Sequence, residues 1–69
     1  MSKSIFSQEQ VDYVLNLFRK NKLQQALDFI DTLPSDLDDK SLLFNIRGAC
    51  YAGLGKLDIA IINYKKAIE

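Results

Sequence analysis

The apolar residues of this chain recur at helical spacing, and three interruptions divide the pattern into four short stretches. The interruptions are Asn21, Pro34 and the Gly53-Leu54-Gly55 segment, and these residue types close helices or form turns. We therefore expect helices over residues 8–20, 23–33 and 39–52, and a fourth from residue 57 that is still running at residue 69. The sequence predicts an all-α fold.

The start of the first helix carries the clearest local signal. Ser7 can accept a hydrogen bond from the backbone N–H of Gln10, and the Gln10 side chain can reach back to Ser7, which is a capping box. Phe6 can pack on Val11 as the accompanying hydrophobic staple. Asn21 is expected to close the first helix in a left-handed conformation, and the Gly53-Leu54-Gly55 segment is expected to close the third helix with two glycines that tolerate positive φ.

An acidic cluster precedes the third helix. Asp36, Asp38 and Asp39 suit the positive end of a helix dipole. A calcium loop would need Gly at its sixth position and Glu at its twelfth, where a count from Asp36 finds Ser41 and Arg47. The cluster is therefore interpreted as a helix start.

The chain contains an internal repeat. Residues 41–69 can be laid over residues 7–35, which places Gly55 on Asn21, Leu57 on Leu23 and Ala60 on Ala26. The second unit resembles the tetratricopeptide (TPR) repeat, through a pattern of aromatic and small residues that here reads Phe44, Gly48, Tyr51, Gly55, Ala60, Tyr64 and Ala67. The resemblance implies two antiparallel helix-turn-helix hairpins stacked as a short right-handed superhelix, in one domain over residues 1–69.

The first unit, about residues 7–40, follows the pattern mainly in register, because Val14 stands where the second unit has Gly48. In the second unit, about residues 41–69, Arg47 replaces an aliphatic residue that is usual in the family, and Asp38 stands where a Pro between repeats is common. The small side chains of Gly48 and Ala60 allow two helices to cross within about 8 to 10 Å of each other. Around this crossing we expect Tyr51, Leu57 and Tyr64 to fill the remaining volume. For Tyr51 and Tyr64 the alternative to core packing is direct contact with a ligand.

Length and charge exclude several classes of protein. A chain of 69 residues buries only about 60% of the surface of its unfolded form, which excludes a large enzyme core. Nine basic and nine acidic residues give no net positive charge, which argues against nucleic acid as a partner. No apolar run approaches the roughly 20 residues that span a membrane. With no secretory signal at the start, we expect a cytoplasmic protein.

Little in the sequence could carry chemistry. The chain has no His and one Cys, so neither a His/Cys zinc site nor an internal disulfide is expected. Cys50 therefore has no His to act as its base and is interpreted as a partly buried, inert thiol. Lys56 follows two glycines, as in a phosphate loop, but Leu57 stands where that motif needs Ser or Thr. We expect no catalysis, no cofactor and no metal.

The expected function is protein–protein interaction or scaffolding. In arrays of helical hairpins, the first helix of each hairpin lines a concave face that receives peptides or partner helices. The resemblance implies that this face is formed by Gln8, Val11, Asp12, Leu15, Phe18 and Arg19, together with Leu42, Asn45, Ile46, Ala49 and Ala52. We expect the ligand to be a protein or peptide.

Two other interpretations stay open. The chain has the pattern expected of the N-terminal part of a longer TPR array, and such a segment could orient the substrate of a larger enzyme such as a glycosyltransferase or sulfotransferase. Alternatively, the apolar residues of the fourth helix, among them Leu57, Ile61, Ile62 and Ile68, could drive self-association.

Overall fold

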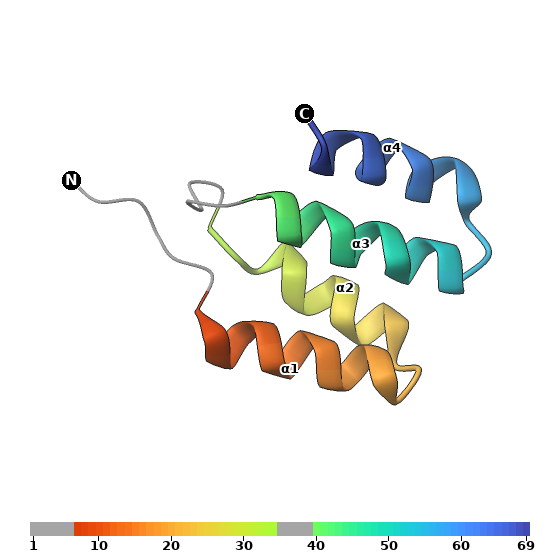
Figure 1. Ribbon diagram of the computed structural model, residues 1–69. Coiled ribbons are helices and arrows are strands. Elements are labelled where there is room, and N and C mark those ends of the chain that lie inside the picture. The colour runs from red at the N-terminus through yellow and green to blue at the C-terminus, as the bar shows by residue number, and fades with distance from the viewer. Residues whose placement is uncertain (1–6, 35–39) are drawn as a thin grey trace.

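A computed structural model describes residues 7–34 and 40–69. In these residues the chain forms four helices and no strand: α1 (Gln8–Arg19), α2 (Leu23–Asp31), α3 (Ser41–Gly53) and α4 (Leu57–Ala67). Successive helices run in opposite directions and lie beside one another in chain order (Figure 1). The prediction of an all-α fold is confirmed.

The helix ends differ from the expected ones by one or two residues. α2 ends at Asp31, where the Thr32 hydroxyl donates to the carbonyl oxygen of Phe29 at 2.6 Å. The residue before a proline also disfavours helical backbone, so Leu33 cannot easily extend the helix toward Pro34. The expectation that the fourth helix is still running at residue 69 is wrong: α4 ends at Ala67, and the backbone N–H of Ile68 donates to the carbonyl oxygen of Lys65 at 3.3 Å, which closes the last turn more tightly than an α-helix does.

The capping box of α1 is confirmed. The backbone N–H of Gln10 donates to Ser7 Oγ at 3.2 Å, and the backbone N–H of Ser7 donates to Gln10 Oε1 at 3.0 Å. The staple residue Phe6 and the acidic cluster at residues 36, 38 and 39 lie outside the described residues.

Each hairpin turn has one residue with positive φ. Asn21 has φ 60° and Gly55 has φ 80°, at the two positions that the sequence predicted. Gly53 was expected to follow the third helix, whose end was placed at residue 52, but it is the last residue of α3. A Cβ atom on Gly53 would lie 2.5 Å from Leu23 Cδ1, so a larger residue there would have to displace the end of the Leu23 side chain on α2.

The hydrophobic core is built by the first three helices. Its buried residues come from α1, α2 and α3, and they are Val14, Leu17, Leu23, Ala26, Leu27, Ile30, Leu43, Ile46 and Cys50. Among the described residues, α4 adds none to this cluster and buries only Ala60 and Asn63. The Asn63 side chain is satisfied locally, because its Nδ2 donates to the carbonyl oxygen of Ile59 at 2.9 Å.

α4 is joined to α3 by the predicted close crossing. A Cβ atom on Gly48 would lie 2.8 Å from the ring of Tyr64 and 3.2 Å from the carbonyl oxygen of Ala60. Tyr51 packs against the core as expected. The prediction for Leu57 is wrong, since it is 61% exposed. Leu57 is the first residue of α4, one turn before Ala60, and the contacts with Gly48 at the crossing come from Ala60 and Tyr64.

Arg47 forms a polar link between the hairpins. Its guanidinium pairs with the Asp31 carboxylate at the end of α2. Both side chains are partly exposed, so the pair adds little stability, but it gives the unusual residue at this position a partner on the neighbouring helix.

Candidate functional site

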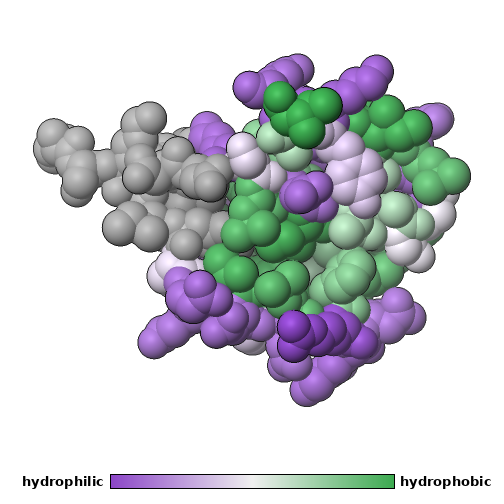
Figure 2. Space-filling view, in the orientation of Figure 1, coloured by the Kyte–Doolittle hydropathy of each residue, from purple (hydrophilic) through white to green (hydrophobic). Residues whose placement is uncertain are grey.

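A groove of about 250 Å³ opens between α1, α3 and α4. It is lined by seven residues from three helices: Leu15, Phe18, Leu42, Asn45, Ile46, Ala49 and Tyr64. Hydrophobic side chains gather in the middle of the face shown in Figure 2, with hydrophilic ones along the lower margin, where α1 lies. Segments far apart in the sequence therefore meet at one concave, largely apolar surface.

Helical spacing places these residues on common faces. Leu15 and Phe18 are three residues apart on α1, and the four residues from α3 follow intervals of three, one and three. Ile46 is buried and belongs to the hydrophobic core, so it forms the floor of the groove. Phe18 and Leu42 are 36% and 41% exposed and stand at the surface. The groove thus presents accessible apolar side chains above a floor that belongs to the core.

The lining carries no Lys, Arg, Asp or Glu side chain. Its polar groups are the amide of Asn45 and the phenol of Tyr64. On α1, Gln8 Nε2 donates to Asp12 Oδ1 at 2.9 Å, and both residues are exposed outside the groove. The groove is therefore suited to neutral ligands with apolar side chains rather than to charged ones.

Six of the residues that sequence reasoning placed on the concave face line this groove, and they are Leu15, Phe18, Leu42, Asn45, Ile46 and Ala49. The other five do not. Val11 is buried, Ala52 is partly buried, and Gln8, Asp12 and Arg19 lie on the exposed surface. α1 contributes only its second half to the groove, so the residues of its first turn lie outside it.

Tyr64 lines the groove although it was not among the residues expected on the concave face, where core packing was favoured over ligand contact for this side chain. The sequence predicted that Tyr64 packs beside Gly48, and its ring does lie against that glycine. The side chain is nevertheless 37% exposed and lines the groove. The missing Cβ of Gly48 makes room for the ring at the α3 surface, and this spacing was the signal that could have identified Tyr64.

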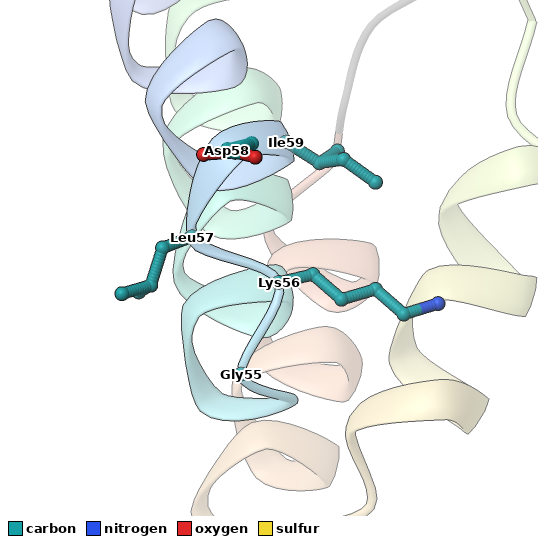
Figure 3. Close-up of a pocket in the computed structure, with 5 residues that line it drawn as sticks. All are labelled: Gly55, Lys56, Leu57, Asp58 and Ile59. Atoms are coloured by element: carbon teal, nitrogen blue, oxygen red, sulfur yellow. The ribbon is translucent and has the colours of Figure 1, made fainter.

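A second hollow, of about 350 Å³, lies at the start of α4. It is lined by five consecutive residues, from Gly55 to Ile59. In Figure 3, Lys56 and Ile59 point to one side of α4 and Leu57 to the other, so these side chains do not converge. Gly55 and Lys56 belong to the turn between α3 and α4, which agrees with the prediction of a helix-to-helix turn rather than a phosphate loop.

A third hollow, of about 240 Å³, lies between the end of α2 and α3. Its lining includes Arg47 and Asp31, which already neutralise each other in their ion pair. It offers fewer accessible apolar groups than the groove, so we take the groove as the candidate site.

Cys50 is fully buried in the core, more deeply than the sequence suggested. Burial raises the pKa of its thiol above the ordinary value of 9.0, so the thiol is protonated at neutral pH and is a poor nucleophile. In the part of the chain that the structure describes, no three His, Cys, Asp or Glu side chains gather closely enough to hold a metal ion. No helix over residues 7–34 and 40–69 has the length and apolar character to cross a membrane.

Comparison of the chain with models of known protein families, with curated proteins and with solved structures found no match. The function is therefore inferred from the helical fold and from the geometry of the groove.

Proposed function

We propose that this chain is a TPR-like interaction module that binds a short segment of a partner protein in the groove between α1, α3 and α4. One observation carries the proposal: side chains from three helices converge on a single concave surface, and most of them are apolar. Apolar side chains left accessible in a concave surface mark binding sites more often than isolated surface residues do.

The size of the groove favours a peptide over a small molecule. Its volume of about 250 Å³ is below the roughly 300 to 1,000 Å³ of pockets that enclose drug-sized ligands. An extended or helical segment can instead insert a few apolar side chains and remain partly in solvent. Asn45 and Tyr64 are placed to hydrogen-bond the polar groups of such a segment.

The proposed arrangement of the hairpins follows from the same fold. α2 packs against both α1 and α3, so the second hairpin stacks directly on the first. We infer that this stacking is the right-handed superhelix of a TPR array, in which the first helices of the hairpins share the concave face. The groove contains residues from α1 and α3, as such a stack requires.

Selection of binders from a library of short random peptides tests the proposal. Peptides rich in apolar residues are expected, and Phe18→Ala and Leu42→Ala should each weaken their binding by about tenfold, because desolvated anchors dominate such interfaces. Ile59→Ala is the matched control, since Ile59 has the same 41% exposure as Leu42 but lies outside the groove. Ile46 is unsuitable for this test because it belongs to the core.

The salt dependence of binding gives a second criterion. The groove carries no ionised side chain, so affinity for a selected peptide should change by less than about twofold between low and high salt. Binding that falls steeply with salt, or that survives both Phe18→Ala and Leu42→Ala, would show that peptides attach elsewhere.

A further inference from the structure

The side of α4 that faces away from α3 is unusually apolar for an exposed helix surface. Ile61 and Ile62 are 51% and 52% exposed, and Leu57 and Ile68 are exposed beside them. Along the upper edge of the molecule, where α4 lies, hydrophobic side chains stand between hydrophilic ones (Figure 2). An apolar surface of this kind indicates a contact that the single chain does not satisfy.

Two opposite charges lie at the centre of this surface. Ala60 and Asn63 mark the buried side of α4, and at 100° per residue the opposite side is centred on Asp58 and Lys65, with Ile61 and Ile62 between them. We call the surface formed by Asp58, Ile61, Ile62 and Lys65 the outer face of α4. It is separate from the groove.

Asp58 and Lys65 cannot neutralise each other within one helix. They are seven residues apart, which at 1.5 Å per residue is about 10 Å along the axis. Within residues 7–34 and 40–69 neither side chain takes part in an ion pair. Each charge therefore lacks an ion-pair partner among the residues that the structure describes, although it lies beside exposed isoleucines.

We propose that the outer face of α4 binds the outer face of a second copy of this chain, with the two helices antiparallel about a two-fold axis between Ile61 and Ile62. Such an axis places Asp58 of one copy opposite Lys65 of the other, twice, and brings the isoleucines together between the two ion pairs. The antiparallel arrangement also opposes the two helix dipoles favourably.

The charge pattern selects this geometry over the alternatives. A parallel pair of α4 helices would place Asp58 opposite Asp58 and Lys65 opposite Lys65, which repel. The face spans a single helix of 11 residues, and stable interfaces usually bury about 800 Å² on each partner. The dimer is therefore expected to be weak and to form reversibly as concentration rises.

Sedimentation equilibrium at increasing protein concentration tests this directly. The unaltered chain should pass from monomer to dimer. Asp58→Lys and Lys65→Asp should each weaken dimerisation at least about fivefold at low salt, because both ion pairs become repulsive contacts. Glu9→Lys is the control for the first variant, since Glu9 is likewise the acidic residue in the first turn of its helix, and it should not change dimerisation.

Mixing the two single variants tests most directly whether Asp58 pairs with Lys65 across the dimer. Asp58→Lys chains carry two lysines on the face and Lys65→Asp chains carry two aspartates, so the mixture should form heterodimers at least as well as the unaltered chain forms homodimers. The double variant Asp58→Lys/Lys65→Asp should also regain homodimerisation. Far-ultraviolet circular dichroism verifies that each variant keeps its helices.

Ile61→Asp tests the apolar part of the face and should abolish the dimer. A chain that stays monomeric at every concentration overturns the proposal and leaves the face to another protein or to another segment of a longer chain. A dimer that is unaffected by the single charge variants and by Ile61→Asp overturns it as well, because that dimer uses a different surface.

Discussion

The two hairpins of this molecule are held together in different ways. α1 and α2 bury large aliphatic side chains against each other and against α3, in one continuous core. α4 adds no residue to that core in the part of the chain that the structure describes, and it is attached to α3 by a close approach at Gly48, Ala60 and Tyr64. The hairpin with the clearer sequence pattern is therefore the one with the smaller share of the core.

This difference shows that the repeat motif and the hydrophobic core determine different properties of the molecule. The motif residues of the second hairpin set how closely two helices approach, which is a matter of small side chains. Stability depends instead on the apolar area removed from water, and here that area is concentrated where the motif is weakest. The mutations below should separate the two contributions.

The largest effect is expected from Leu27→Ala. Leu27 is nearly fully buried in the core between the first three helices, and deleting a buried leucine side chain costs about 2 to 5 kcal/mol. A chain this small has only a few kcal/mol of stability, so the whole molecule should unfold in thermal melts. Ile62→Ala is the control, because Ile62 is exposed and its loss should shift the midpoint by only a few degrees. If Leu27→Ala melts like the control, the core has been located wrongly.

Gly48→Leu should have the next largest effect, and it should be confined to the second hairpin. The new side chain would meet the Tyr64 ring and the backbone of Ala60, and overpacking of this kind costs about 1 to 3 kcal/mol. Ala60→Leu should act through the same crossing. We expect helix to be lost from α4 while α1 to α3 stay folded, as amide signals resolved by nuclear magnetic resonance would show. Simultaneous loss of all four helices would contradict the claim that the α3–α4 crossing and the core of the first three helices contribute to stability separately.

The two hairpin turns should respond unequally to substitution. Gly55 has φ 80°, and a Cβ atom added there would meet no other atom within 4 Å, so Gly55→Ala should lower stability through backbone strain alone, by about 1 to 2 kcal/mol. Asn21 has a similar φ but is a residue that tolerates it, so Asn21→Gly should change stability by only a few tenths of a kcal/mol. Urea unfolding of both variants measures the two changes in the free energy of unfolding. Equal losses of stability for Gly55→Ala and Asn21→Gly would contradict the prediction that the two turns differ.

The smallest effect concerns Cys50, the core residue next to Tyr51 on α3. Its pKa is raised by burial, so folding favours the protonated thiol. The resulting stability is present below the ordinary pKa of 9.0 and is lost as the pH rises from there toward the higher pKa of the folded state. The free energy of unfolding, measured from pH 7 to 10, should therefore fall more steeply for the unaltered chain than for Cys50→Ala. Parallel curves would mean that Cys50 is accessible to water.

Local structure was readily predicted from the sequence because it depends on neighbouring residues. The capping box at Ser7, the positive φ at Asn21 and Gly55, and the crossing at Gly48 each follow from a few adjacent side chains or from one missing side chain. Apolar periodicity also gave the order and type of the four helices.

The other differences arise because apolar periodicity identifies the apolar face of a helix but not the element that covers it. Val11 was expected on the concave face and is buried, whereas Leu57 was expected to pack around the crossing and is exposed. Tyr64 packs at the crossing and lines the groove at the same time, which no spacing rule on α4 alone could show. These outcomes depend on how the helices pack in three dimensions.

The central claim is that α4 is attached to a core that the other three helices form without it. Native-state hydrogen exchange, measured amide by amide at a concentration low enough to keep the chain monomeric, tests this claim directly. The account predicts that the amides of α4 exchange through an opening of lower free energy than the amides of α2, whose protection should approach that of global unfolding. If the amides of α4 and α2 share one opening free energy, all four helices form a single cooperative unit and the claim is contradicted.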